Sequence, residues 1–479
     1  MPRRPHLVTS TWRLPDGPGP IRHRIADVVV ERIKSGRLRP GDQLPPTRVL
    51  ARELGVARSA ALAAYDELRA AGFVESTAGS ATLVAHGADR AALGGARPHV
   101  VAPAHTGPAH PVPRVSPIRW DLRTGRPDPA LIDPVAWRRA WRPSSRLDVA
   151  ELARYVPEHR PLRTALADHL RRTRAVICDP DGVLVVPGIA ACLPVLAAVL
   201  CALDRANVAI EDPGYLEGRP LLERGGLRLR PIAIDSDGLD PAHLGSADRC
   251  VYVTPAHQYP LGARMPVDRR ADLISWAERT DGLIIEDDYD GEFRYDVSPL
   301  PALHSLDGAP DRVIYLGTTS KLLSPALRVA WVLPPPWLLA PLRQALAEAS
   351  VVVNLPTGEA LTRLLTSGAL VAHHARASRT YAARRAAVVA AFRRRLPLAP
   401  LAGIDAGLHL VVRLPDDSDD HALAATLADA GVLLRPLSSF CVERRLSGLV
   451  LGYARLPETR AEQVVAMIAQ VIAANARSR

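Results

Sequence analysis

The chain has 479 residues, 48% of them hydrophobic, which predicts roughly two to four domains with sizeable cores. It has no run of about 18 or more apolar residues and no apolar h-region near its N-terminus, so we expect neither a transmembrane helix nor a signal peptide. Five scattered cysteines without a CxxC pair favour reduced thiols in a cytoplasmic protein and no metal site. A net charge of +10 permits binding to nucleic acid.

The first 86 residues carry half of the excess positive charge. They hold 13 arginines and lysines against 8 aspartates and glutamates, a net of +5 in under a fifth of the chain. This concentration of charge indicates that a nucleic-acid-binding module, if there is one, lies at the N-terminus.

The same segment has the pattern of helix, turn, helix, turn, helix and hairpin. A first helix is predicted from four apolar residues on one face, Ile25, Val28, Val29 and Ile33. A second helix opens at residue 45, Gly55 makes a turn, and a third helix runs from about 58 to 71. Residues 73–84 alternate around Gly79 like a small hairpin. Three helices with a hairpin form a winged helix-turn-helix, which places its third helix in the major groove.

The segment RLRPGDQLPPTRVLARELGVARSAALAAYDELRAAGFVES, residues 37–76, resembles the DNA-binding domain of GntR-family regulators. The resemblance implies that Arg48, Arg58 and Ser59 contact operator DNA together with the wing around Gly79. Both arginines flank the turn, where side chains can reach phosphates or a guanine edge, although they can also be ordinary solvated charges. The family's polar run at the start of the reading helix is reduced here to residues 57–61, ARSAA, which removes hydroxyl contacts and a helix cap.

Residues 86–117 are rich in Ala, Gly, Pro and His and show no helical or alternating period. Prolines make such a segment a semi-rigid linker, which can span up to about 100 Å when extended. The predicted domains are therefore a winged helix at 1–85, a linker at 86–118 and a third region at 119–479. That region divides into a large subdomain at about 150–370 and a small C-terminal subdomain at about 371–479.

From Trp120 onward, short β-rich runs alternate with amphipathic helices, which is typical of an α/β domain with a parallel sheet. The predicted strands are 182–186, 207–211, 250–254, 283–287, 312–317 and 328–333. After about residue 395, three further strand runs surround a helix at 421–430, and a last helix begins near Glu458. This final stretch predicts a smaller α+β unit.

Lysine occurs only at Lys34 and Lys321, against 58 arginines. Arginine can replace a solvated surface lysine, but its guanidinium never becomes a free amine and cannot form a Schiff base. Lys321 follows the strand RVIYLG and a polar turn, at the strand's carboxyl end, where open α/β sheets place ligands. It is therefore a candidate for covalent chemistry, with the alternative that it is a leftover, as Lys34 can be.

Three further residues near predicted strand ends have the groups that pyridoxal phosphate needs. Asp287 ends another central strand and can pair with a protonated pyridine nitrogen. Tyr289, two residues on, can donate to the ring oxygen, and Arg328 can pair with a phosphate through its planar fork. Each has an ordinary alternative as a helix cap, a core residue or a common arginine, but together and in this order they favour a cofactor site.

The segments TPAHQYPLGARMP, IIEDDYDGEFRY, GTTSKLLSPALRVAWVLPP and AGLHLVVRL resemble fold-type-I aminotransferases, in the version fused behind a GntR winged helix, the MocR/GabR-type regulators. The resemblance implies pyridoxal 5′-phosphate as the cofactor, with Lys321 as its Schiff-base lysine. It also implies a homodimer, head-to-tail and domain-swapped. The residues it implies for the cofactor are Asp287 at the pyridine nitrogen, Tyr289 at the ring oxygen, Arg328 and Thr318 at the phosphate, Tyr215 on the ring face, and Tyr155 at the phosphate in the partner subunit.

Several positions depart from the family pattern. Gly188-Ile189-Ala190-Ala191 stands where relatives have Gly-Ser/Thr-Gln-Gln, so a hydroxyl is missing while backbone N–H groups can still bind phosphate. The segment YVPEHRPLR lacks both glycines of the family's Tyr-Gly-x-Pro-x-Gly. Glu217 stands where relatives that bind a carboxylate have arginine, and Ser439 where an arginine or other polar residue can occur. The nearby candidates to replace these arginines are Arg219 and Arg435.

The leading hypothesis is a transcriptional regulator that binds operator DNA and pyridoxal phosphate. The cofactor, or an amino-acid or amine effector that forms an aldimine with it, would shift the protein between two states of different affinity. The alternative is an active aminotransferase with a DNA-binding appendage, although its substrate-carboxylate arginines are altered. A third hypothesis makes the large domain only a dimerisation platform, against which the retention of Lys321 argues.

Overall fold

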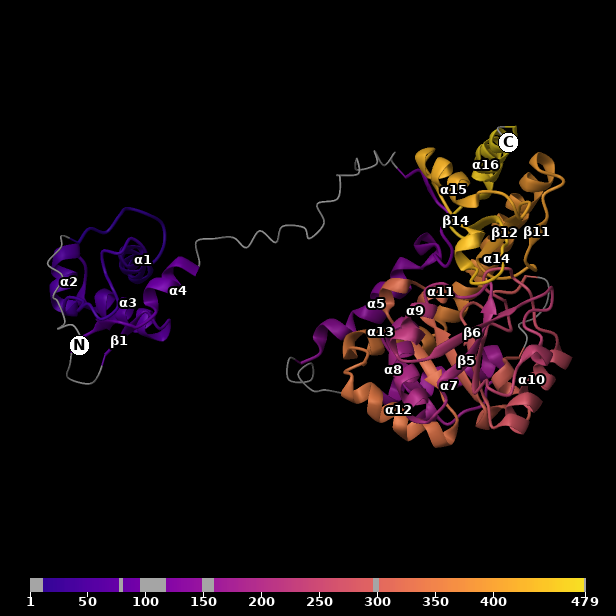
Figure 1. Cartoon of the computed structure of the whole chain (residues 1–479), viewed down its shortest axis with the longest axis horizontal. Helices are drawn as coiled ribbons and strands as arrows, with labels where there is room; N and C mark the ends of the chain where they lie inside the picture. Colours follow the sequence, from indigo (N-terminus) through magenta and orange to yellow (C-terminus); the bar gives the residue numbers. More distant parts are fainter. Residues whose placement is uncertain (1–11, 77–80, 95–117, 149–158, 296–300, 478–479) are drawn as a thin grey trace. The chain divides into compact units, whose positions relative to one another are not determined.

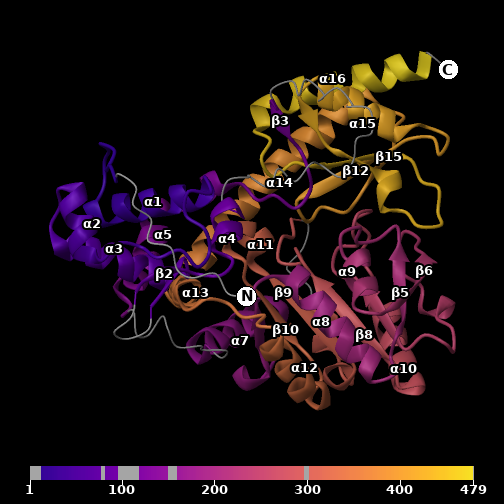
Figure 2. The same cartoon turned by 60° about the vertical axis from the view of Figure 1, so that its left-hand side comes forward.

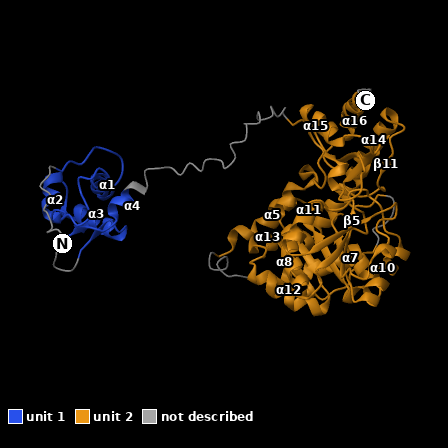
Figure 3. Cartoon of the chain, viewed as in Figure 1, with its two compact units in different colours: residues 1–113 blue, residues 114–479 orange. Residues whose placement is uncertain are grey.

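Figure 1 presents the computed structural model of the chain, which describes residues 12–76, 81–94, 118–148, 159–295 and 301–477. These residues belong to two compact units, residues 1–113 and 114–479 (Figure 3). The division falls inside the predicted linker. No helix in the described ranges is long and apolar enough to cross a membrane.

The N-terminal unit is a winged helix-turn-helix, as predicted. Its elements are α1 (Ile21–Lys34), α2 (Thr47–Leu54), α3 (Arg58–Ala70), β1 (Val74–Glu75), β2 (Leu83–Val84) and α4 (Ala88–Gly94). Gly55 ends α2 in the left-handed conformation, with φ of 66°, which makes the sharp turn before α3. The antiparallel pair β1–β2 is the base of the wing, and the predicted wing residue Gly79 lies outside the described residues.

Helix α4 corrects the prediction of a structureless linker after residue 85. It lies against α1, and Ala88 and Ala92 are buried in the same core as Ile25 and Val29. The small side chains of α4 gave no helical hydrophobic period, because alanine contributes little to such a pattern. The core of the N-terminal unit therefore extends into the predicted linker as far as Ala92.

The C-terminal unit is built on a seven-stranded sheet. In spatial order its strands are β4 (Leu184–Val186), β10 (Ala330–Leu333), β9 (Val313–Thr318), β8 (Leu283–Asp288), β7 (Cys250–Val253), β5 (Asn207–Asp212) and β6 (Arg228–Ala233). All six predicted strands are present. The sheet is parallel, as predicted, except at β10, which runs antiparallel to both of its neighbours. Strand β6 was not predicted, since its sequence RLRPIA is an exposed and arginine-rich edge.

Helices cover both faces of this sheet, which is why its central strands are buried. One face packs against α8 (Ile189–Ala202) and α12 (Pro336–Glu348). The other packs against α10 (Val267–Thr280), α7 (Arg160–Arg174) and α13 (Leu355–Thr366). The remaining helices and 3₁₀ turns of the large subdomain are α5 (Pro134–Trp141), α9 (Arg219–Arg224), α11 (Thr319–Leu322), η1 (Pro129–Leu131), η2 (Pro143–Arg146), η3 (Pro180–Gly182), η4 (Pro241–His243), η5 (Leu303–Ser305), η6 (Ala309–Asp311) and η7 (Pro325–Leu327).

A smaller α+β part follows, as predicted. Its sheet has the order β11 (Leu401–Ala402), β12 (His409–Arg413), β15 (Gly448–Gly452) and β14 (Arg435–Pro436). Its helical elements are α14 (Ala369–Arg395), α15 (Asp420–Asp429), η8 (Leu437–Phe440) and α16 (Glu458–Arg477), and α14 packs along α16 (Figure 2). Strand β13 (Val432–Leu433) pairs in parallel with β3 (Trp120–Asp121), so the start of the C-terminal unit is tied to its end.

Candidate functional site

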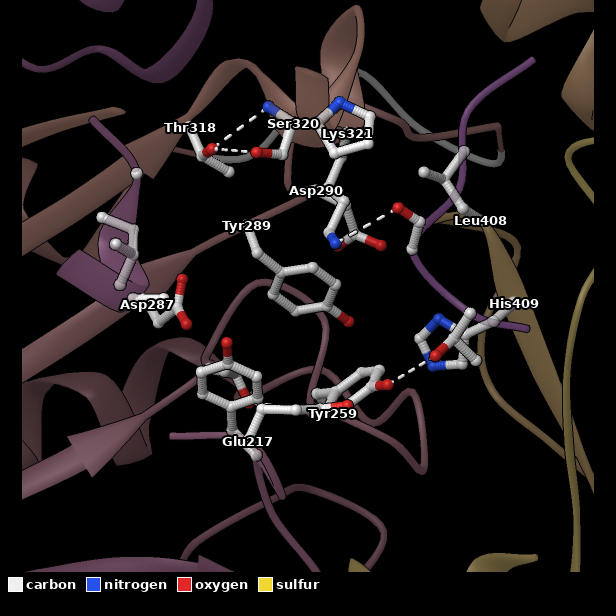
Figure 4. A pocket seen from close by; sticks show the side chains of 18 of the residues that line it. Glu217, Tyr259, Asp287, Tyr289, Asp290, Thr318, Ser320, Lys321, Leu408 and His409 are labelled. Carbon is white, nitrogen blue, oxygen red and sulfur yellow. Dashed lines mark hydrogen bonds between the residues drawn. The ribbon is translucent and has the colours of Figure 1, made fainter. Parts of the chain in front are cut away.

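One cavity of the C-terminal unit gathers the predicted cofactor residues at the carboxyl ends of β8 and β9. Its volume of about 240 Å³ lies just below the usual range for drug-sized ligands, so it suits a small molecule. The predicted residues that line it are Gly188, Ile189, Ala190, Tyr215, Asp287, Tyr289, Thr318, Lys321 and Arg328. Figure 4 shows several of these side chains converging on the cavity. The predicted Tyr155 lies outside the described residues.

Lys321 projects from the short helix α11 into the cavity. Its Nζ donates a hydrogen bond of 3.2 Å to the carbonyl of Gly125. Burial lowers the pKa of Lys321, against the opposing effect of Asp290, Asp287 and Glu217. A lowered pKa enlarges the fraction of neutral amine, the form that attacks a carbonyl. Gly125 has φ of +72°, and a Cβ there would lie 2.4 Å from Nζ, so any other residue would strain the backbone and displace the amine.

Asp287 is the buried carboxylate of the site, with 7% of its surface exposed. Burial raises its pKa to about 6, although the hydroxyl of Tyr252 lowers it by donating a 2.5 Å hydrogen bond to Oδ2. Tyr252 lies on the neighbouring strand β7, opposite Ile285 and therefore diagonal to Asp287 on the same face. The sequence analysis missed Tyr252. Its position within the run CVYV, in register with LIIED, was the signal that could have identified it.

Tyr289 lies beside Asp287 in the cavity, but its hydroxyl is bonded within the protein. It donates to the carbonyl of His257 at 2.9 Å and lies 3.1 Å from His257 Nδ1, which in turn pairs with Asp290 Oδ2 at 3.0 Å. Neither His257 nor Asp290 was predicted. With His409 they form a buried group whose polar atoms lie within 4.8 Å of one another, a spacing that would allow a metal ion. Inside this group His257 bonds Asp290, whereas His409 Nε2 lies 2.9 Å from the carbonyl of Pro260.

The opposite end of the cavity has the groups that bind an anion. Gly188 precedes the N-terminus of α8, and a Cβ on it would lie 3.4 Å from Arg328 Cζ, so the guanidinium stands directly over the helix start. Thr318 Oγ1 donates to Ser320 Oγ at 3.0 Å and accepts from Ser320 N at 3.1 Å. A guanidinium, two hydroxyls and a helix N-terminus together suit a phosphate. Ser320 was not among the predicted phosphate ligands, and its place in the turn before Lys321 was the available signal.

Aromatic rings line the side wall of the cavity. The rings of Tyr215 and Tyr259 meet edge to face with centroids 6.3 Å apart, and the Tyr259 hydroxyl bonds Thr124 Oγ1 at 2.6 Å. Burial raises the pKa of both phenols, so both stay protonated at neutral pH. The predicted ring-stacking residue Tyr215 is thus in the cavity, next to an unpredicted aromatic partner.

The two candidate arginines have different places. Arg435 lines the cavity and its Nη1 lies 2.8 Å from Glu217 Oε1. Arg219 instead donates to the carbonyls of Ser439 and Cys441, outside the cavity, and Ser439 also lies outside it. Of the two, only Arg435 can therefore reach a ligand in this cavity.

In the N-terminal unit, the three predicted DNA-binding residues that the structure describes are exposed. Arg48 is the second residue of α2, and Arg58 and Ser59 are the first two residues of α3. Helix α3 has no side-chain cap at Ala57, as expected from the loss of the family's hydroxyl there. The N-terminal turns of α2 and α3 thus present arginine and free backbone N–H groups, which are the groups that bind phosphate.

Comparisons with known proteins agree with this division. Residues 21–84 match the family of bacterial regulatory proteins of the gntR type, and residues 125–467 match the aminotransferases of class I and II. The crystal structure of an archaeal alanine:glyoxylate aminotransferase is 24% identical and has a TM-score of 0.68, covering 74% of this chain and 90% of that one. At this identity the likeness shows the fold. The class I and II aminotransferase fold implies the use of pyridoxal phosphate.

Two regulators are similar over nearly the whole chain. The probable rhizopine catabolism regulatory protein MocR of Rhizobium meliloti is 33% identical over 462 residues, 94% of this chain and 93% of that protein. The pyridoxine biosynthesis transcriptional regulator PdxR of Corynebacterium glutamicum is 32% identical over 469 residues, 96% of this chain and 97% of its own length. With a GntR winged helix followed by a class I and II aminotransferase domain, and with these relatives, the chain belongs to the MocR-type transcriptional regulators of the GntR family.

Proposed function

We propose that this regulator binds operator DNA through Arg48, Arg58, Ser59 and its wing, and holds pyridoxal phosphate at Lys321. The cofactor, or an amino compound that reacts with it, changes the affinity for DNA. Two parts of this proposal go beyond membership of the family. One is the set of residues that bind DNA and the cofactor, and the other is the cofactor's effect on the affinity for DNA. The similarity to two regulators over more than nine tenths of their length supports this function over that of an aminotransferase with a DNA-binding appendage.

The observation that carries the cofactor assignment is the environment of Lys321. In a chain with two lysines, one of them lies in a cavity between a buried carboxylate and an anion-binding end. The residues present fit the group: Asp287 suits a pyridine nitrogen, and Arg328, Thr318 and Ser320 suit a phosphate. When bound, pyridoxal phosphate would supply an electrophilic carbon at which the lysine amine can be exchanged for a ligand amine.

The side chains have distinct roles in this assignment. Tyr252 orients the carboxylate of Asp287 by donating to Oδ2, so Oδ1 would be available to a ring nitrogen. Tyr215 would cover a ring face, and Tyr289 would hold the ring oxygen once its hydroxyl gives up the hydrogen bond that it now donates to the His257 carbonyl. A protonated ring nitrogen beside Asp287 would lower its pKa from the value of about 6 that burial gives it, and so would favour the charged carboxylate.

Signalling requires that the ligand binds two states of the protein with different affinity. We include a head-to-tail homodimer in the proposal, because the family resemblance implies one and because Tyr155 would then act in the partner subunit. Light scattering of the purified protein with and without DNA measures this part separately. A monomer at micromolar concentration contradicts the dimer but leaves the cofactor assignment intact.

The cofactor assignment is tested by absorbance titration of the purified protein with pyridoxal phosphate. We expect the visible band of lysine-bound cofactor in the native chain and in Lys34→Arg, and its absence in Lys321→Ala. Lys34 is the matched control, since it lies on α1 in the other unit. A band that persists in Lys321→Ala overturns the role of this lysine, and no band in any of the three overturns the cofactor.

The regulatory assignment is tested by DNA binding of the same proteins. We expect the affinity for a selected DNA site to change when the cofactor is added to the native chain and to stay constant for Lys321→Ala. Conversion of an amino acid and a keto acid over many turnovers, without any effect on DNA binding, would support the enzyme instead.

A further inference from the structure

The cavity has a second charged group besides the cofactor residues, the ion pair of Glu217 and Arg435. Glu217 follows Tyr215 in the segment after β5, and Arg435 belongs to β14 of the smaller sheet. Arg435 Nη1 and Glu217 Oε1 lie 2.8 Å apart, and the side chains are 34% and 43% exposed. Exposed ion pairs are weak, so a ligand that satisfies both charges can open this one.

The pair is the charged part of the cavity that is left once the cofactor residues, and Asp290 in its pair with His257, are set aside. Arg328 lies at the anion end, and Arg219 is held by the carbonyls of Ser439 and Cys441. Arg123 and Arg126 are both bound to Asp121. Within the described residues, Arg435 is therefore the cation available to a ligand carboxylate at this end, and it already has an anionic partner.

The charges of the pair discriminate between ligands. A ligand with a lone carboxylate would take Arg435 but would leave Glu217 without its partner and next to a second anion. A ligand with a lone ammonium would pair with Glu217, but it would leave Arg435 without its partner and next to a second cation. A group that carries both charges on one carbon can pair with both residues at once, so no charge is left unpaired.

We infer that the effector is a diamino monocarboxylic acid, whose distal amine reacts at Lys321 while its α-amino and carboxylate groups pair with Glu217 and Arg435. This inference rests on the proposed function, because it takes the cofactor at Lys321 as the reacting group. It assigns Glu217 and Arg435 as the residues that determine effector specificity. Tyr215 and Tyr259, whose rings meet beside the pair, form the wall along which the methylene chain of the ligand lies.

Three probes of matched length separate the charges. Ornithine carries an amine, a chain and an α-amino acid head; 5-aminopentanoate lacks its α-amino group, and putrescine lacks its carboxylate. Calorimetric titration of the protein loaded with pyridoxal phosphate should give ornithine an affinity at least about tenfold above each of the other two, since each wrong ligand leaves one charge unpaired.

Two variants test the residues themselves. In Glu217→Gln the advantage of ornithine over 5-aminopentanoate should disappear, because a lone carboxylate then meets no anion. In Arg435→Gln the advantage of ornithine over putrescine should disappear, because a lone ammonium then meets no cation. The double variant should show no preference. Circular dichroism and the cofactor band confirm that each variant is folded and loaded.

The ranking in the native chain needs no variant and decides the inference alone. If the loaded protein prefers 5-aminopentanoate or putrescine, or binds none of the three, the inference is wrong while the proposed function stands. The same holds if neither variant alters the ranking. If no cofactor band forms at all, the proposed function fails first and the inference falls with it.

Discussion

The two units place their functional residues in opposite environments. In the N-terminal unit, Arg48 and Arg58 are exposed and do not belong to the hydrophobic core of that unit. In the C-terminal unit, Asp287 is 7% exposed and Lys321 lies in a cavity between the large and small sheets. Function is therefore separable from stability in the first unit, whereas in the second both depend on the same buried charges.

Substitution of Asp287 should have the largest effect, because it should change both the stability of the C-terminal unit and its binding of the cofactor. Its folded pKa is about 6 against an ordinary 3.8, so the folded state binds the proton more tightly than the unfolded state. The buried charge then costs nothing below about pH 4, and the cost grows as the pH rises to about 6 and stays constant above it. Asp287→Asn should therefore stabilise the cofactor-free protein at pH 8 relative to pH 4, by up to about 3 kcal/mol.

The measurement is urea unfolding at several pH values, followed by tryptophan fluorescence. Six of the seven tryptophans lie in the C-terminal unit, so the signal reports mainly on that unit. Asp290→Asn is the control, since it breaks the pair with His257 and should be destabilising throughout. If Asp287→Asn raises the free energy of unfolding equally at every pH, the buried charge of Asp287 is not the cause of the gain. The same variant should bind pyridoxal phosphate more weakly.

Substitution of Arg58 should show the opposite, a loss of function without a loss of stability. Arg58→Ala should weaken binding to a DNA site, selected by the native protein from random sequences, by about 5- to 150-fold. The unfolding free energy should change by no more than about 0.5 kcal/mol, because the side chain is exposed.

Arg69→Ala is the matched control on the same helix. Arg69 lies in the last turn of α3 and pairs with Asp66 at 2.8 Å. Fluorescence anisotropy at several salt concentrations compares the two variants, and a smaller salt slope for Arg58→Ala would identify its contact as a phosphate. An equal loss for both arginines would mean that the unit binds DNA by net charge alone.

In the C-terminal unit, a substitution of Gly125 should affect both the stability of the fold and the binding of the cofactor. Its φ is +72°, and a Cβ would lie 2.4 Å from Lys321 Nζ. Gly125→Ala should cost about 1–2 kcal/mol of stability and should also lower the affinity for pyridoxal phosphate, because Nζ must move. Gly238→Ala is the control, since Gly238 has φ of +88° in open space. Differential scanning calorimetry should find similar destabilisation in both, and only Gly125→Ala should change the cofactor titration. Unchanged cofactor affinity would show that the Lys321 amine has room elsewhere.

The sequence predicted the elements that carry a strong period or a distinct residue. Six of the seven strands of the large sheet were predicted, and the central ones have runs of Val, Ile and Tyr that are buried on both faces. The antiparallel direction of β10 was not predictable, since a residue pattern contains no strand direction. Strand β6 was missed because five of its six residues are not fully buried and two are arginines.

The site was predictable where one residue type is chemically required. Lys321 and Asp287 were found because an amine and a carboxylate at strand ends have few other purposes together. Tyr252, Ser320 and the His257–Asp290 pair were missed because their roles depend on which strands are neighbours and on how a loop turns. The pairing of Glu217 with Arg435 joins residues more than 200 positions apart, which no local pattern predicts.

Helix α4 offers the smallest and last comparison, because it tests where the N-terminal unit ends. Ala92 is 2% exposed against α1, while the neighbouring Ala91 is exposed. Glycine at either position costs about 0.5–1 kcal/mol of helix stability, and only Ala92→Gly also loses a buried methyl group, worth about 0.8 kcal/mol. Hydrogen exchange of the α1 amides should therefore be faster in Ala92→Gly than in Ala91→Gly. Equal rates would mean that α4 forms without supporting the winged helix, and that this unit ends at residue 85 in energetic terms. Faster exchange in Ala92→Gly alone would mean that the DNA-binding unit includes α4 and does not end at the hairpin.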